Sequence, residues 1–90
     1  MSQAIEGKIA LVTGANRGIG KSYVDVFIAH GAAKVYAGVR DLSTAEPLVK
    51  AHGDRVVPLH LDLADGATIE KAAETAKDVT IVINNGGVLT

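Results

Sequence analysis

The 90-residue sequence contains no cysteine. Neither disulfide bonds nor thiolate metal sites can therefore form, which is compatible with a reducing compartment. His30, His52 and His60 form no pair of metal ligands, so we expect no bound metal. An excess of charge is also lacking, since 9 Lys and Arg residues against 10 Asp and Glu residues give a formal net charge of -1. With no basic run, the chain has no electrostatic footprint for nucleic acid or an anionic membrane.

Long apolar segments are missing as well. Residues 1–6 show no basic region leading into an apolar one, and no apolar run approaches the length that spans a membrane. The remaining composition, 48% hydrophobic and 21% charged residues, is that of a globular chain able to bury the core of one small domain. We therefore expect a soluble cytoplasmic protein with no nucleic-acid or membrane partner.

Four short, mainly apolar segments alternate with helical patterns. They predict strands at residues 9–12, 34–39, 56–61 and 79–83. Pro58 cannot donate to a strand ladder, so the third strand should lie at a sheet edge. The alternation predicts an α/β fold, a Rossmann-type doubly wound parallel sheet with the strand order 3-2-1-4.

Helices are predicted between the first three strands. The first is expected over residues 18–30 and ends at Gly31. Its helical spacing is carried by Ile19, Tyr23, Val26, Phe27 and His30. Ser43 with Glu46 three positions later offers a capping box for the second helix, which reaches about Ala51.

The end of the chain holds a third helix and the fourth strand. Asp65 or Thr68 can cap this helix, which runs through Ala76. In the order 3-2-1-4 the fourth strand is an unpaired edge, although its sequence is that of a strand buried on both faces. We therefore expect residues 1–90 to be the first half of a single domain that continues beyond Thr90 in the complete protein.

A glycine-rich motif lies between the first strand and the first helix. It reads Thr13-Gly14-Ala15-Asn16-Arg17-Gly18-Ile19-Gly20. Its glycines let backbone N–H groups reach a pyrophosphate at the positive end of the helix. The other three strands end at Arg40, at Asp62-Leu63 and at Asn84-Asn85-Gly86-Gly87. Because the carboxyl ends of parallel strands lie along one edge, these motifs predict a single dinucleotide site, against the alternative of ordinary turns.

The glycine-rich motif resembles the cofactor motif of the classical short-chain dehydrogenase/reductase family. The motif after the fourth strand resembles that family's Asn-Asn-Ala-Gly, and the likeness runs from Gly7 through Val88. The residues that the resemblance assigns to cofactor binding are Gly14, Asn16, Arg17, Gly18, Ile19, Gly20, Arg40, Asp62, Leu63, Asn84, Gly86 and Gly87.

The resemblance also implies separate roles at the last two strand ends. Asn84 helps to hold the cofactor, Asn85 braces the strand ends, and Gly86 and Gly87 give the cofactor room. Gly86 stands where the family usually has alanine, and a glycine still fits a close backbone approach. Asp62 hydrogen-bonds the adenine amino group and the next residue offers a backbone contact. The alternative for Asp62 is an exposed turn aspartate.

The choice of cofactor depends on the end of the second strand. There an acidic side chain takes the ribose hydroxyls of NAD, and an arginine accommodates the 2′-phosphate of NADP. In the resembled family the acidic residue falls at the position of Val39, whereas basic residues at the positions of Arg40 or Arg17 go with NADP. Asp41 lies beyond the expected position and is placed to help cap the next helix. We predict NADP rather than NAD, against the alternative that both arginines are solvated surface residues.

The resemblance implies an NADP-dependent oxidoreductase that transfers hydride between nicotinamide and a small-molecule carbonyl or alcohol substrate, and we expect the complete protein to be a homo-oligomer. The family's chemistry needs a serine and a Tyr-x-x-x-Lys pair. Tyr23 is followed at that spacing by Phe27, and Tyr36 by Arg40, so we expect no catalytic residue among these 90. The chain is then the cofactor-binding half of the enzyme. Two alternatives remain: a non-catalytic dinucleotide-binding sensor or regulator on the same fold, and a deliberately isolated half-domain.

Overall fold

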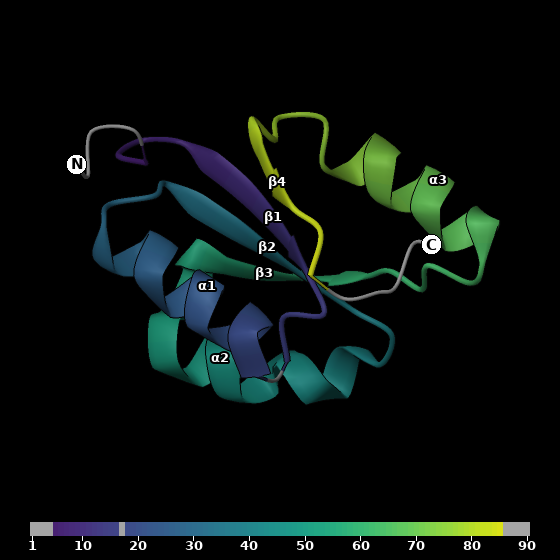
Figure 1. The fold of residues 1–90 in the computed structure, drawn as a ribbon, viewed down its shortest axis with the longest axis horizontal. Coiled ribbons are helices and arrows are strands. Elements are labelled where there is room, and N and C mark those ends of the chain that lie inside the picture. The colour runs from purple at the N-terminus through teal and green to yellow at the C-terminus, as the bar shows by residue number, and fades with distance from the viewer. Residues whose placement is uncertain (1–4, 17, 86–90) are drawn as a thin grey trace.

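The computed structural model describes residues 5–16 and 18–85 (Figure 1). The strands are β1 (Ile9–Thr13), β2 (Lys34–Val39), β3 (Val56–His60) and β4 (Ile81–Ile83). The α-helices are α1 (Gly18–Ala29), α2 (Glu46–His52) and α3 (Gly66–Thr75), and the short 3₁₀ helices η2 (Leu42–Ala45) and η3 (Gly53–Arg55) flank α2. Of the predicted site residues, Arg17, Gly86 and Gly87 lie outside the described residues.

The four strands form one parallel sheet in the order β3-β2-β1-β4. This confirms the predicted Rossmann-type α/β arrangement. In the described part of the chain β3 pairs only with β2, and Pro58 stands opposite Ala37 in that pair. A proline has no backbone N–H to donate to a neighbouring strand, so its place in an edge strand follows from its chemistry.

Helices cover both faces of the sheet and give the chain three layers. Figure 1 shows α1 and α2 on one face and α3 on the other. The larger core lies under α1 and α2 and includes Ala10, Val12, Val24, Phe27, Val35, Ala37, Val39, Leu48 and Val56. A smaller cluster under α3 consists of Tyr36, Leu59, Leu61, Ala72 and Ala76. Because successive strand residues point to opposite faces, covering both faces explains why β2 is apolar along most of its length.

The buried face of α1 differs from the predicted one. Its buried residues are Gly20, Val24 and Phe27. Of the five residues whose spacing predicted the helix, only Phe27 is buried, whereas Ile19 is 67% and Val26 is 46% exposed. Two apolar stripes follow helical spacing here, and the one that contains Gly20 faces the sheet because a glycine allows the closest approach. The helix ends at Ala29, and Gly31, with φ of 90°, takes the left-handed conformation that was expected to stop it.

The helix caps were only partly predicted. Ser43 does not cap α2. Instead Asp41 caps η2 by accepting the backbone N–H of Ser43, and α2 follows with Pro47 in its first turn. Proline is tolerated there because the first helical N–H groups have no partner within the helix. Of the two candidates for α3, Asp65 is the cap, since its side chain accepts the backbone N–H of Ala67.

β4 is shorter than predicted and begins at Ile81 rather than Val79. The N–H of Val79 donates to the carbonyl oxygen of Ala76 at 3.3 Å, so a turn occupies this position and the strand begins after it. Among the described residues β4 pairs only with β1, so it forms the second edge of the sheet, as the predicted order required. Ile83 packs against the larger core, whereas Val82 on the opposite face is 61% exposed rather than buried.

Candidate functional site

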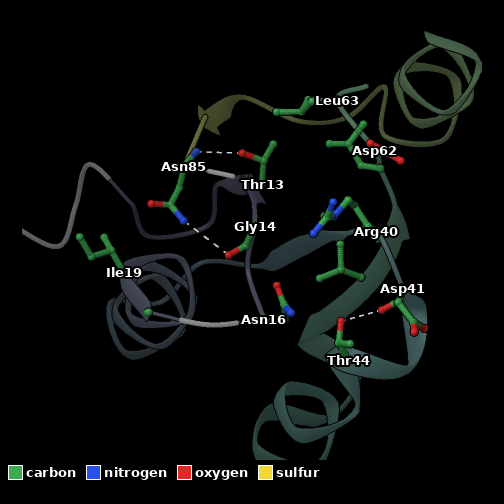
Figure 2. Close-up of a pocket in the computed structure, with 14 residues that line it drawn as sticks. Thr13, Gly14, Asn16, Ile19, Arg40, Asp41, Thr44, Asp62, Leu63 and Asn85 are labelled. Atoms are coloured by element: carbon green, nitrogen blue, oxygen red, sulfur yellow. Dashed lines mark hydrogen bonds between the residues drawn. The ribbon is translucent and has the colours of Figure 1, made fainter. Parts of the chain in front are cut away.

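A cavity of about 650 Å³ opens at the carboxyl edge of the sheet (Figure 2). Its walls come from the segments that follow β1, β2 and β3 and from Asn85 after β4. The predicted site residues that line it are Gly14, Asn16, Gly18, Ile19, Arg40, Asp62 and Leu63. Strand ends that are far apart in the sequence therefore meet in one crevice.

The turn between β1 and α1 depends on two glycines. Gly14 and Gly18 have φ angles of 61° and 58°, in the left-handed region that favours glycine. The N–H of Ala15 donates to the carbonyl oxygen of Gly38 at 3.2 Å and ties the turn to β2. Because α1 begins at Gly18 on the cavity wall, the N–H groups of its first turn and the positive end of its dipole lie at the cavity. A phosphate group fits such a position.

Gly20 lies behind the cavity wall and is buried in the first turn of α1. A β-carbon at this position would collide with the carbonyl oxygen of Gly14 and lie 2.6 Å from Asn85 Nδ2. Gly20 therefore allows α1 to pack directly onto the turn and onto the end of β4. Its place in the structure is a packing position rather than a part of the cavity lining.

Thr13 fastens the end of β1 to the end of β4. The backbone N–H of Asn85 donates to Thr13 Oγ1 at 2.8 Å, and the Thr13 hydroxyl donates to Asn84 Oδ1 at 3.2 Å. Asn85 Nδ2 also donates to the carbonyl oxygen of Gly14 at 3.4 Å (Figure 2). Asn85 thus braces the strand ends and lines the cavity, whereas Asn84 is exposed and outside the lining.

The segment after β3 forms a tight turn at the cavity. Asp62 Oδ1 accepts the N–H of Ala64 at 2.9 Å, and the carbonyl oxygen of Asp62 accepts the N–H of Asp65 at 2.8 Å. Asp62 and Leu63 are both half-buried in the cavity wall. Oδ1 is engaged inside the turn, and the carboxylate of Asp62 keeps further capacity to accept a hydrogen bond from a ligand, at Oδ2 in particular.

Three consecutive residues at the end of β2 differ sharply in what they offer to the cavity. Val39 is 2% exposed and apolar. Arg40 is exposed, and Figure 2 shows its side chain extending toward the glycine turn. The Asp41 carboxylate points away from the cavity in the same view. The hydroxyl and N–H of Ser43 donate to Asp41 Oδ1 at 2.8 and 3.0 Å, and these hydrogen bonds hold the pKa of that carboxyl below its usual value.

The sequence interpretation missed several lining residues. Gly38, Thr44 and Leu61 line the cavity although no motif marked them. A β-carbon on Gly38 would lie 3.1 Å from Leu61 Cδ2 and 3.3 Å from the carbonyl oxygen of Val12, so this glycine lets the sheet close up beside the cavity. A glycine inside a strand pattern is a known signal of close backbone approach, and it could have identified Gly38.

The described lining offers groups whose chemistry suits binding and orienting a ligand. They comprise the backbone N–H groups of the glycine turn, the amide of Asn16, the guanidinium of Arg40 and the carboxylate of Asp62. Over residues 5–16 and 18–85, no three His, Asp or Glu side chains gather as a metal site would require. In the same residues no helix has the length and apolar character to cross a membrane.

A parallel sheet in this order, with a glycine turn and a cavity at its carboxyl edge, defines a Rossmann-like fold of the nucleotide-binding class. Comparison with known proteins narrows this class. A family model described as short chain dehydrogenase matches residues 8–90. The chain therefore belongs to the short-chain dehydrogenase/reductase family.

Individual relatives agree with this assignment. The chain is 40% identical to a short-chain dehydrogenase/reductase of Armillaria gallica over 94% of its own length and 30% of the relative's. It is 37% identical to the 3-oxoacyl-[acyl-carrier-protein] reductase FabG of Salmonella typhimurium, again over 94% of the chain but 36% of the relative. The chain thus spans about a third of the length of these curated relatives.

Solved structures of relatives share the fold. A short chain dehydrogenase from Burkholderia cenocepacia, in complex with NADP, matches with a TM-score of 0.85 and 43% identity over 93% of this chain and 34% of that one. A 3-ketoacyl-(acyl-carrier-protein) reductase from Brucella melitensis, complexed with NADH, matches with a TM-score of 0.77 and 34% identity over 93% of this chain and 36% of that one. The relatives therefore include a complex with NADP, which carries a 2′-phosphate, and a complex with NADH, which lacks it.

Proposed function

We propose that residues 1–90 are the N-terminal, cofactor-binding half of a single Rossmann domain that continues beyond Thr90. The complete protein is an NADP-dependent oxidoreductase that transfers hydride between nicotinamide and the carbonyl or alcohol carbon of a small-molecule substrate. Family membership and the cavity at the carboxyl edge of the sheet support this proposal. We also propose that the complete protein is a cytoplasmic homo-oligomer, and the absence of cysteine from residues 1–90 is compatible with that compartment.

The observation that carries the preference for NADP is the arrangement at the end of β2. Binding of NAD calls for a carboxylate at the ribose hydroxyls, whereas an arginine suits the 2′-phosphate of NADP. Val39 supplies no carboxylate, and the Asp41 carboxylate is committed to Ser43. Arg40 is the described cation on this wall of the cavity. Arg17 is a second arginine assigned to the phosphate, through the family motif.

Each of the other site residues is assigned to a different part of the dinucleotide. Backbone N–H groups near Gly14 and Gly18 hold the pyrophosphate. Asp62 accepts a hydrogen bond from the adenine amino group, and the Leu63 backbone contacts the same ring. Ile19 lies at the opposite end of the cavity from Arg40 in Figure 2, which suits the nicotinamide end. When bound, the nicotinamide ring carries the hydride.

Further family positions complete this half of the site. Asn16 lines the cavity and offers its amide to the ribose or the phosphates. Gly20 keeps the glycine turn against α1. The family motif assigns Asn84 to holding the cofactor and assigns Gly86 and Gly87, which lie outside the described residues, to leaving room for it.

Dissociation constants of NADP and NAD for variants of the complete protein test the preference. A charge-assisted hydrogen bond contributes roughly 1.5–3 kcal/mol, so Arg40→Ala should weaken NADP binding about tenfold to a hundredfold and leave NAD nearly unchanged. Val39→Asp should reverse the preference, because a carboxylate accepts from ribose hydroxyls and repels the phosphate. Lys50→Ala removes one exposed positive charge from α2, outside the cavity lining, and controls for the loss of net charge.

Equal losses for both cofactors in Arg40→Ala would contradict the assignment of Arg40 to the 2′-phosphate.

A measurement of turnover distinguishes an enzyme from the alternative, a non-catalytic sensor. NADP-dependent oxidation or reduction of simple alcohols or carbonyls by the complete protein is expected, whereas residues 1–90 alone should show none, because they contain no Tyr-x-x-x-Lys sequence. Dinucleotide binding without turnover by the complete protein would favour the sensor.

A further inference from the structure

The hydroxyl of Thr68 occupies the centre of the turn that follows β3. Thr68 lies in the first turn of α3 and is 8% exposed. Its Oγ1 accepts the backbone N–H of Asp62 at 2.9 Å. Its single hydrogen has two carbonyl oxygens within reach, that of Asp62 at 2.9 Å and that of Asp65 at 2.8 Å. One side chain thus engages both backbone groups of Asp62.

Capping of the helix does not account for these contacts. Asp65 already caps α3 by accepting the N–H of Ala67 at 3.0 Å. The distinctive partner of Thr68 is Asp62, six residues earlier, on the far side of the turn. This hydrogen bond is partly buried, and a backbone N–H withdrawn from water that loses its acceptor is destabilising, so the contact constrains the conformation of Asp62.

Thr68 is not part of the cavity lining, whereas Asp62 and Leu63 are. Its influence on a ligand therefore passes through these two residues. The backbone of Asp62 determines where its Oδ2 points and how the backbone of Leu63 faces the cavity. The N–H of Ala64 holds the other carboxylate oxygen, so the side chain moves together with the turn.

We propose that Thr68 is a positioning residue of the cofactor site, whose hydroxyl holds the Asp62–Leu63 segment in the orientation that recognises the adenine ring. This inference rests on the proposed function, because it assumes a dinucleotide in the cavity. It adds a residue from α3 to a site whose described lining comes from strand ends and the segments on the α1 and α2 side.

The test compares NADP with its hypoxanthine analogue, which lacks the adenine amino group. Wild-type complete protein should bind NADP more tightly than the analogue. Thr68→Val removes the acceptor at nearly constant volume and should weaken NADP binding about tenfold while affecting the analogue much less. Thr68→Ser should restore the discrimination. Thr75→Val, an exposed threonine on the same helix and outside the cavity lining, is the matched control and should bind both dinucleotides as the wild type does.

The outcomes separate this inference from the proposed function. Failure of the wild type to bind either dinucleotide would overturn the proposed function itself. Equal affinity of the wild type for both dinucleotides, or an equal loss of affinity for both in Thr68→Val, would leave the proposed function standing and overturn the positioning role.

Amide hydrogen exchange provides a measurement that needs no variant. The Asp62 N–H should exchange slowly in the wild type, and exchange as fast as that of an unprotected amide would overturn the inference as well.

Discussion

Gly20 packs so closely against the carbonyl oxygen of Gly14 that no β-carbon fits between them. The contact joins the first turn of α1 to the glycine turn, whose N–H groups we propose to bind the pyrophosphate. Asn85 Nδ2 reaches the same carbonyl oxygen at 3.4 Å. The shape of the glycine turn therefore depends on a residue outside the cavity lining.

Gly20→Ala should disrupt the glycine turn. The added methyl group must displace backbone atoms, and overpacking of this kind costs about 1–3 kcal/mol. We expect a lower free energy of unfolding of the complete protein, measured by chemical denaturation, and a loss of NADP affinity. Gly66→Ala is the control, because a β-carbon there meets nothing within 4 Å. If both variants were equally stable, the close contact at Gly20 would not be a constraint.

A second prediction concerns pH and a group of charged and polar side chains at the amino end of β2, away from the cavity. Asp78 accepts from Lys34 Nζ at 2.8 Å and from the Tyr36 hydroxyl at 2.9 Å. These hydrogen bonds, that of Lys34 first, hold the pKa of Asp78 below its usual 3.8. The hydrogen bond to Asp78 is also the largest cause of a pKa of Lys34 above its usual 10.5.

The two shifts define a pH window. A carboxyl with a lowered folded pKa stabilises the fold above 3.8 and loses its contribution as the pH falls through the folded value. An amine with a raised folded pKa stabilises the fold below 10.5 and loses its contribution as the pH rises through the folded value. Asp78→Asn should therefore lower the thermal midpoint at neutral pH but not at strongly acidic pH. Asp54→Asn, at an exposed aspartate of η3, is the control. A deficit that did not change with pH would contradict the assignment.

A third prediction concerns Arg55, which holds the end of α1. Its guanidinium donates to the carbonyl oxygens of Ile28 at 3.1 Å and Ala32 at 2.6 Å. These carbonyls lie at and just after the last turn of the helix. That of Ile28 also accepts the backbone N–H of Gly31 at 3.1 Å, so Arg55 is its second donor. Arg55→Ala should lower the free energy of unfolding by about 1 kcal/mol, and Arg55→Lys should recover part of the loss. Lys50→Ala should change it little, and an equal loss in that control would show that net charge alone is responsible.

A fourth prediction concerns β4, which is an edge of the described sheet. An apolar strand edge is a template for pairing with another chain. Purified residues 1–90 should therefore associate in a concentration-dependent way in sedimentation velocity experiments. Val82→Lys places a charge on β4 and should reduce the association, whereas Ile69→Lys, at an exposed position of α3, should not. A sharp monomer peak with cooperative unfolding of the wild-type fragment would contradict this prediction.

The strand order and the location of the cavity could be predicted because they depend on local signals. Pro58 excludes an interior strand, and a run of apolar residues followed by a glycine or a polar residue marks the end of a parallel strand. The family motif added the cofactor class. These signals belong to single segments, and the rule that parallel strands end at one edge brings the segments together.

Features that depend on packing between segments were not predictable in this way. The exposed stripe of α1 that contains Ile19 has the same helical spacing as the buried stripe that contains Gly20, and glycine carries no hydrophobic signal. Ser43 and Glu46 matched a capping pattern, but the N–H of Ser43 donates to the carboxylate of Asp41 instead. Thr68 was considered only as a cap, since its contact with Asp62 requires the turn between them to be closed.

The residues that form the walls of the cavity are synthesised one segment after another, in their order along the sequence. Thr13 and Gly14 come first, then the residues after β2, then Asp62, and Asn85 is the last described contributor. Protein synthesis proceeds from the amino end, whereas a domain generally folds as a unit. Under the proposed continuation beyond Thr90, a nascent chain on the ribosome has all the described walls of the crevice before its substrate-binding part exists. A dinucleotide that binds this crevice stabilises the folded domain by mass action, so the cofactor would act as a ligand of folding as well as of the chemistry.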